Sequence, residues 1–103
     1  MAKITTIFWR DIPAQVIGQQ GRKRVKQVLD PRFSAAIDRA AMRAGKGSSQ
    51  AYLDEWKRES RPCEGELQLA VNTEVKSLEA QFPESTLEAT VKAGGFVKKG
   101  SMK

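Results

Sequence analysis

Trp9, Arg10 and Asp11 place an aromatic ring, a guanidinium group and a carboxylate at consecutive positions. They follow an apolar, β-branched run, so we expect them at the end of a strand. In that position Arg10 is suited to hold a phosphate or a carboxylate, with Trp9 as a stacking wall. A local role is also consistent with these residue types, because Asp11 can accept hydrogen bonds from turn amides and pair with Arg10. The sequence leaves both interpretations open.

A basic segment follows this motif at short distance. Its cations are Arg22, Lys23, Arg24 and Lys26. Together with the arginines at positions 32, 39 and 43, they are expected to line one basic surface whose affinity for phosphates falls as salt rises. No helix-turn-helix, RNA-recognition or zinc-finger pattern accompanies them, and aromatic residues are not interleaved with them. Nucleic acid is therefore the second candidate partner, and a solvated face that keeps the protein soluble is the structural alternative.

The net charge of +6 is unevenly distributed along the 103 residues. Residues 1–52 hold ten Lys/Arg against three Asp, and residues 53–103 hold eight Lys/Arg against nine Asp/Glu. This asymmetry predicts a basic face formed by the N-terminal half and suited to anionic partners.

Residue types that commonly carry catalysis are scarce. Histidine is absent and Cys63 is the single cysteine, so the commonest general base and the usual zinc ligands are missing. Arg61 favours a thiolate at Cys63 while Glu64 and Glu66 oppose it, so a plain surface cysteine is expected. These glutamates, with Asp54, Glu55 and Glu59, show no EF-hand spacing. We predict no catalytic residue, no metal and no cofactor, and an independent enzyme is disfavoured.

The N-terminal residues predict a β-hairpin. Ile4–Trp9 and Ala14–Gln19 are rich in β-branched residues, and Pro13 favours a four-residue turn over residues 10–13. Gly18 marks a bulge or a close approach of another element. The apolar spacing of Val25, Val28 and Leu29 then predicts a short helix that carries the basic segment.

Four further helices are expected downstream. Asp30-Pro31 predicts an N-cap and first-turn proline, followed by a buried stripe of Phe33, Ile37, Ala40, Ala41 and Ala44 and a stop at Gly45. A third helix should begin at Ser48 or Ser49 and end at Arg61-Pro62-Cys63. A fourth should run from Glu64 through Leu67, Val71, Val75, Leu78 and Phe82, with an acidic first turn. Ser85-Thr86-Leu87-Glu88 predicts a capping box for the last one.

The resulting fold class is α+β: an N-terminal antiparallel hairpin packed on four to five helices. Phe96-Val97 is predicted as a third strand or a docking tail. Residues 1–97 are expected to form one domain, and residues 98–103 a disordered basic tail. No apolar run approaches a membrane span and no signal-peptide core follows Met1, so a cytoplasmic location without membrane contact is expected.

The block from Phe8 to Val16, FWRDIPAQV, resembles the short bacterial domain family called "virulence factor". Gly21–Arg24, Phe33, Ala36–Gly45 and Tyr52–Trp56 continue the likeness, which covers roughly residues 3–95. The block is also similar to the corresponding segment of conserved virulence factor C. Its longer members join the domain to helical repeats, which implies an interaction module. Free-standing members are encoded among one-carbon and corrinoid methyl-transfer genes, which implies an accessory role in methyl transfer.

The function that we predict is a small non-enzymatic adaptor or accessory subunit that docks on a protein partner. Its expected contact surface comprises Trp9, Arg10, Asp11, Arg22, Lys23, Arg24 and Lys26. Strand addition at the exposed hairpin edge is the expected docking mode, and a homodimer through that edge is the alternative assembly.

Overall fold

The computed structural model describes residues 2–45 and 49–96. Its first two strands, β1 (Ala2–Trp9) and β2 (Ile12–Gln20), pair in antiparallel register, so the predicted hairpin is confirmed. The turn is shorter than the predicted four residues, because Ile12 and Pro13 already pair with Trp9 and Phe8. Arg10 makes this tight reversal in the left-handed region, with φ of 55°. We call the end of the sheet at this turn the lower end.

The basic segment is a strand, β3 (Lys23–Val28), and the helix predicted for it is wrong. Gly21 has a φ of 60° and allows the chain to reverse directly after Gln20, so that Lys23 pairs with Gln20. Val25 then lies opposite Gly18 and packs against the core. Val28, which the helical spacing placed beside it, is 55% exposed.

The segment predicted as the third helix divides into a short helix and a strand. Helix α2 spans Ser49–Leu53, and β4 spans Trp56–Cys63. Pro62 does not interrupt β4, because an edge strand has one side without ladder hydrogen bonds. The strand order is β3-β2-β1-β4, which puts the hairpin in the middle of the sheet. The hairpin edges that were expected to be free for strand addition or a homodimer are therefore occupied by β3 and β4.

The longer helices are α1 (Pro31–Arg43), α3 (Leu67–Gln81) and α4 (Glu84–Lys92). The start of α1 is confirmed: Pro31 occupies its first turn, and the Arg32 amide donates a 3.0 Å hydrogen bond to Asp30 Oδ1. The stop at Gly45 is confirmed by its φ of 72°.

Both later helix starts differ from the prediction. Helix α3 begins at Leu67 rather than Glu64, because β4 extends to Cys63 and Gly65 turns the chain with φ of 83°. Its first turn holds no acidic residue. Helix α4 begins at Glu84, which places Ser85 inside the helix and leaves no capping box.

The α+β class is therefore confirmed, but the arrangement is a four-stranded antiparallel sheet with three helices of nine residues or more and the short α2 within the described part of the chain. Phe96 belongs to no strand, and Val97 and the predicted tail lie outside the described residues. No helix in residues 2–45 and 49–96 has the length and apolarity needed to cross a membrane.

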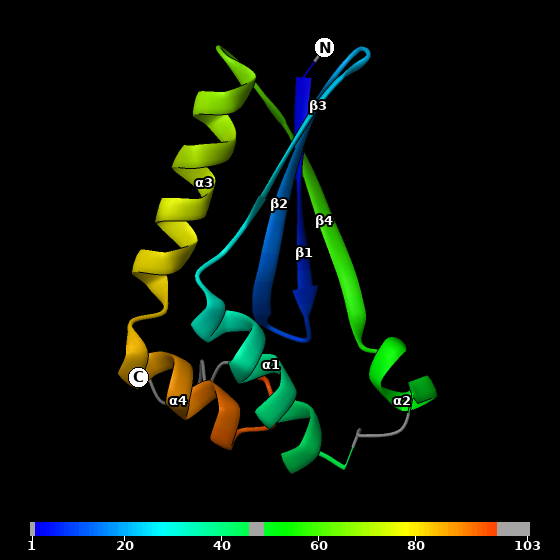
Figure 1. Cartoon of the computed structure of the whole chain (residues 1–103), viewed down its shortest axis with the longest axis vertical. Helices are drawn as coiled ribbons and strands as arrows, with labels where there is room; N and C mark the ends of the chain where they lie inside the picture. Colours follow the sequence, from blue (N-terminus) through cyan, green and yellow to red (C-terminus); the bar gives the residue numbers. More distant parts are fainter. Residues whose placement is uncertain (1, 46–48, 97–103) are drawn as a thin grey trace.

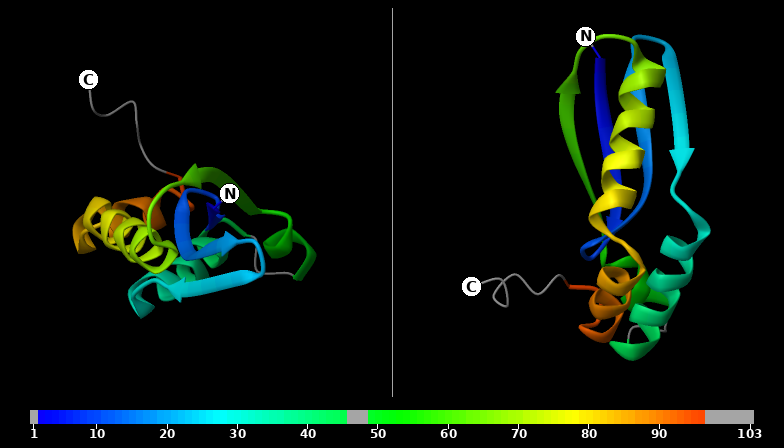
Figure 2. Two further views of the ribbon diagram at one scale, coloured as in Figure 1. Left: turned by 90° about the horizontal axis from the view of Figure 1, so that it is seen from above. Right: turned by 90° about the vertical axis from the view of Figure 1, so that its left-hand side faces the viewer.

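The helices cover one side and the lower end of the sheet. Helix α3 runs along β2 and β3, while α1 and α4 lie together beyond the lower end (Figure 1). Seen from above, α2 lies on the other side of the sheet from α3 (Figure 2). The contact between α3 and β2 is close enough that a Cβ at Gly18 would stand 2.6 Å from Val71 Cγ2. The predicted close approach at Gly18 is confirmed.

Candidate functional site

Trp9 lies in the core at the lower end of the sheet, with no exposed area. Its indole Nε1 donates a 2.9 Å hydrogen bond to the carbonyl oxygen of Tyr52 in α2. The two rings stack with centroids 5.9 Å apart, and Trp56 meets Tyr52 edge-on. Burial raises the pKa of Tyr52, and the Asp38 carboxylate adds to this shift. Trp9 therefore anchors α2 to the sheet and offers no surface to a partner.

Arg10 is likewise engaged inside the molecule, with a side chain only 12% exposed. Its Nε lies 3.1 Å from the Glu55 carboxylate, and its Nη1 donates a 2.8 Å hydrogen bond to the carbonyl oxygen of Gly94. The guanidinium lies 5.2 Å from the Trp9 ring centroid and 4.5 Å from that of Phe96. The guanidinium that was predicted to hold an external anion is thus largely buried and lies beside an internal carboxylate, although its Nε makes no hydrogen bond.

Asp11 completes the motif with further internal contacts. Its amide donates to the carbonyl oxygen of Gly95 at 2.9 Å, and its carboxylate lies 3.6 Å from Lys57 Nζ. The Arg10 amide donates to the carbonyl oxygen of Glu55 at 3.1 Å. The three residues thus join the hairpin turn to the α2–β4 connection and to the C-terminal segment. This geometry favours the structural interpretation of the motif.

The remaining predicted residues lie at β3 and at the turn that precedes it. Strand alternation places Arg24 and Lys26 on the side of the sheet that faces away from α3, which we call the open face. Lys23 is on the α3 side, and Arg22 is in the exposed turn. The cross-strand register gives the composition of the open face above the Trp9–Trp56 pair at its lower end. It carries Lys3, Thr5, Ile7, Gln15, Ile17, Gln19, Arg24, Lys26, Val28, Arg58, Ser60 and Pro62.

The open face has four cations and no carboxylate among its twelve residues. The cations are Lys3, Arg24, Lys26 and Arg58. None of them forms an ion pair with another described residue. Each therefore remains available to an anion from outside. On the opposite side of the sheet, in contrast, Arg61 already pairs with Glu74 of α3.

Apolar side chains occupy the middle and one edge of the open face. Ile17 and Ile7 are half-buried there, and Val28 is exposed on β3. Thr5 and Ser60 share a 2.8 Å hydroxyl–hydroxyl hydrogen bond across β1 and β4. None of the twelve open-face residues is aromatic. By the same alternation Trp9 and Trp56 lie on this side at its lower end, where both rings pack with Tyr52 of α2.

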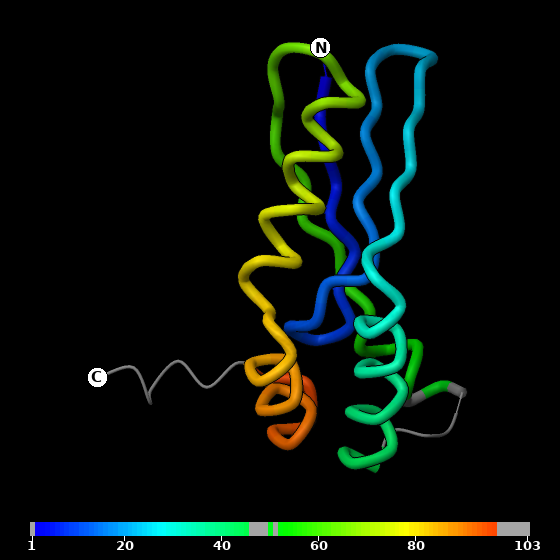
Figure 3. The backbone as a smooth tube through the Cα atoms, turned by 60° about the vertical axis from the view of Figure 1, so that its left-hand side comes forward, coloured from blue at the N-terminus to red at the C-terminus, as the bar shows by residue number. Residues whose placement is uncertain are grey.

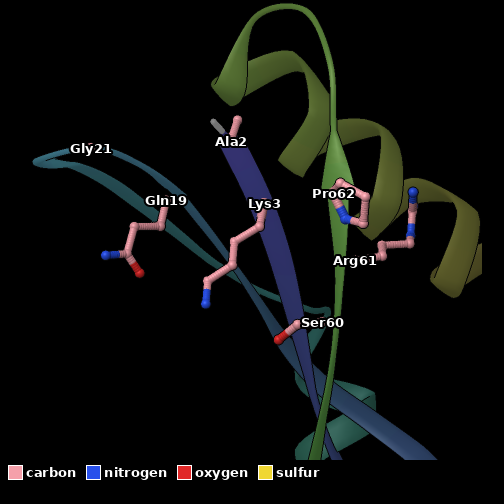
Figure 4. Close-up of a pocket in the computed structure, with 7 residues that line it drawn as sticks. All are labelled: Ala2, Lys3, Gln19, Gly21, Ser60, Arg61 and Pro62. Carbon is pink, nitrogen blue, oxygen red and sulfur yellow. The ribbon is translucent and has the colours of Figure 1, made fainter.

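The upper end of the open face is hollowed. A shallow cavity of about 420 Å³ lies there, bounded by Lys3, Gln19, Ser60 and Pro62 among others. Lys3, Gln19 and Ser60 extend to one side of the sheet from three neighbouring strands, whereas Arg61 points toward α3 (Figure 4). The cavity adds depth to an otherwise exposed surface, with a lysine at its border.

The arginines of α1 do not join this basic surface. Arg39 forms a 2.7 Å ion pair with Glu88, and Arg43 donates to the carbonyl oxygen of Lys92. The Arg39 guanidinium lowers the pKa of Glu88, and Glu88 in turn raises that of Arg39. Arg32 donates to the carbonyl oxygens of Glu79 and Phe82. All three arginines hold α1 against α3 or α4, so the single surface predicted from the sequence is wrong in this part.

The family model for "Virulence factor" matches residues 7–91. The chain belongs to the virulence factor family. No curated protein and no solved structure matches it. The matched range contains the hairpin turn, β3, β4 and most of the helical residues, and it includes Arg24, Lys26 and Arg58 of the open face.

Two open-face cations of this virulence factor domain were missed by sequence reasoning. Lys3 and Arg58 lie on β1 and β4, opposite Gln19 and Ile7 respectively. They lie on the same face only because β4 pairs with β1. The prediction of a helix through Arg58 excluded that pairing. The charge-rich run from Lys57 to Arg61, with Pro62 beside it, is typical of a protected edge strand and was the available signal.

The acidic residues and Cys63 form no metal-binding group among the described residues. Within residues 2–45 and 49–96, no group of three His, Cys, Asp or Glu side chains is placed to hold a metal ion. Cys63 ends β4 opposite Ala2 and is half-buried.

Proposed function

We propose that this domain is a non-catalytic interaction module that binds an acidic surface of a protein partner through the open face. The observation that carries the proposal is the set of four cations without ion-pair partners around Ile7 and Ile17, on a face without carboxylates. Cations that neutralise no internal charge contribute little to folding, whereas they accelerate and select association with an acidic partner.

The apolar residues favour a protein over a nucleic acid. Ile7 and Ile17 offer area that hydrophobic side chains of a protein can cover, with a polar rim around it. Single-stranded nucleic acid binding usually relies on exposed aromatic platforms. None of the twelve open-face residues is aromatic, and Trp9 and Trp56 at the lower end of this side pack with Tyr52 of α2. Phosphate contacts by the same cations are the competing explanation, and nucleic acid stays the alternative partner.

The family resemblance directs the choice of partner. We propose a protein of one-carbon or corrinoid methyl transfer, to which this chain would be an accessory subunit. Family membership over residues 7–91 supports the comparison with other members, and the open face is the surface through which this subunit would dock on such a protein.

Quantitative affinity purification from native lysate tests the proposal, with and without nuclease. Lys26→Glu/Arg58→Glu reverses two open-face cations. Lys76→Glu/Lys92→Glu is the matched control, since it changes the net charge equally at exposed positions of α3 and α4. We expect the first variant to recover about tenfold less of a defined partner protein than the wild type does, and the second variant to recover as much as the wild type.

Two results would contradict the proposal. Equal loss from both variants would mean that only net charge matters, and that the open face has no special role. Bound material that disappears with nuclease would establish the nucleic-acid alternative. Identification of the retained protein by mass spectrometry decides whether it belongs to methyl transfer.

A further inference from the structure

β3 is an edge of the sheet, with no strand beyond it in the described chain (Figure 3). The Leu29 amide donates to the carbonyl oxygen of Ala14 at 3.1 Å, which fixes the phase of the β2–β3 ladder. In an antiparallel ladder every second residue bonds to the neighbouring strand. Residues 27, 25 and 23 therefore bond toward β2, and the backbone amide and carbonyl groups of Arg24, Lys26 and Val28 point away from the sheet.

The Val28 carbonyl agrees with this phase. It accepts a long, 3.4 Å hydrogen bond from the side chain of Gln27 rather than a ladder bond from β2. The residues whose backbone groups point outward are the same ones whose side chains lie on the open face. An extended segment added at this edge would place its own alternate side chains beside Arg24, Lys26 and Val28.

Charge excludes a second copy of this chain as that segment. Two β3 strands paired with each other would bring Arg24 and Lys26 opposite like charges, and β4 presents Arg58 and Arg61 at the other edge. Pro62 also deprives β4 of one amide donor. Lysines on an edge strand prevent pairing between identical copies. The same lysines and arginines favour a segment whose side chains are acidic.

We infer that β3 accepts an acidic, extended segment of the partner as a fifth antiparallel strand. Because the added strand runs antiparallel, its residue opposite Val28 comes first, followed at every second position by those opposite Lys26 and Arg24. The segment therefore reads apolar-x-acidic-x-acidic from its N-terminus. This inference rests on the proposed function. It specifies the chemistry of the partner segment that would lie beside β3, at one edge of the open face.

Synthetic peptides of about ten residues, the length of a long strand, provide the probe. One has Val, Glu and Glu at alternate positions with Thr between and around them. The comparison peptide has the same composition with its two Glu adjacent. We expect the alternating peptide to bind about tenfold more tightly, and the amides of Arg24, Lys26 and Val28 to become protected from hydrogen exchange. Equal binding of the two peptides, or no new protection at these amides, would overturn the inference.

A backbone variant separates strand addition from charge attraction. Val28→Pro removes an outward amide while it leaves every open-face cation in place, and Val28→Thr is its matched control. We expect Val28→Pro to lose peptide binding and Val28→Thr to retain it. The same loss is expected when the peptide, rather than the protein, is N-methylated at its β3-facing amides, and this arm does not depend on the folding of the proline variant.

The outcomes distinguish the inference from the proposed function. If proline and N-methylation leave binding intact while Lys26→Glu/Arg58→Glu abolishes it, strand addition is wrong and the open face remains the binding surface. If Lys26→Glu/Arg58→Glu retains the lysate partner in full, the proposed function itself fails.

Discussion

Arg10 Nη1 donates a 2.8 Å hydrogen bond to the carbonyl oxygen of Gly94, a residue 84 positions later in the chain. The same guanidinium contacts the Glu55 carboxylate and lies against the rings of Trp9 and Phe96. One side chain thus connects the first turn of the protein with its α2–β4 connection and its C-terminal segment. Arg10 therefore serves the integrity of the fold, whereas the cations of the open face have no ion-pair partner among the described residues.

Replacement of Arg10 should therefore be among the more destabilising changes in the chain. Arg10→Met removes the ion pair and the charged hydrogen bond and leaves Glu55 without this partner. We expect a loss of about 2–3 kcal/mol in the free energy of unfolding, measured by urea titration. Arg22→Met, in the exposed β2–β3 turn, is the control and should change it by less than about 0.5 kcal/mol. Similar values for the two variants would show that the Arg10 contacts are not stabilising.

Gly18→Ala tests the close packing of α3 on β2. An alanine Cβ would lie 2.6 Å from Val71 Cγ2 and 2.8 Å from Leu67 Cδ1, so these side chains must shift. We expect a loss of about 1–3 kcal/mol, as for other overpacked cores. In a double-mutant cycle, Val71→Ala should relieve part of this cost, with a coupling of about 1 kcal/mol. Strict additivity of the two losses would contradict the contact.

Arg32 joins α1 to the C-terminal end of α3, and its loss should loosen that junction. Its Nη2 donates to the carbonyl oxygens of Glu79 and Phe82 at 3.1 and 3.0 Å. They lie at the C-terminal end of α3, where carbonyls lack full helical bonding; that of Glu79 accepts only a 3.3 Å hydrogen bond from the Phe82 amide. Arg32→Met should therefore cost about 1–2 kcal/mol in thermal or urea unfolding. Arg32→Lys should recover little, since a single ammonium does not reproduce the planar guanidinium. Full recovery by lysine would indicate that only the positive charge matters.

The Arg39–Glu88 pair predicts a small, acid-sensitive contribution to stability. The hydrogen bond from Arg39 lowers the pKa of Glu88 below its ordinary value of 4.5. The pair therefore stabilises the fold above that pH, and its contribution disappears as the pH falls through the lowered pKa of the folded state. Unfolding free energies of the wild type and Glu88→Gln should differ near neutral pH and converge in acid. A difference that is constant across this range would show that the charge of Glu88 is irrelevant.

The parts of the fold that were predictable depend on local signals. Asp30-Pro31 determines the start of α1 within a few residues, and the β-branched residues around the Arg10–Asp11 turn indicate the hairpin. Strands β3 and β4 were missed because their identity depends on distant partners. Val25 has a spacing typical of a helix, but its pairing with Gly18 places it in a strand. Arg58 belongs to the sheet only because it pairs with Ile7 of β1.

The cations of the open face were likewise predictable from the sequence only where a local signal marked them. Arg24 and Lys26 could be selected from the sequence because they are adjacent in a basic run. Lys3 and Arg58 could not be selected, because they are far apart in the sequence and only the pairing of β1 with β4 brings them to the same face. The role of Arg10 was left open for the same reason, since Glu55 and Gly94 are remote in sequence.

The strand order has a consequence for synthesis of the chain. β1 leaves the ribosome before β4, yet β4 is one of its two neighbours, and the last residue of β4, Cys63, pairs with Ala2. At about 5–20 residues per second, several seconds pass between the emergence of these two strands. During that interval the β4-facing edge of β1, with Ile4 and Phe8 beside it, has no partner within the nascent protein. The sheet can therefore be completed only after translation has passed β4, and until then this edge of β1 is open to pairing with other extended chains.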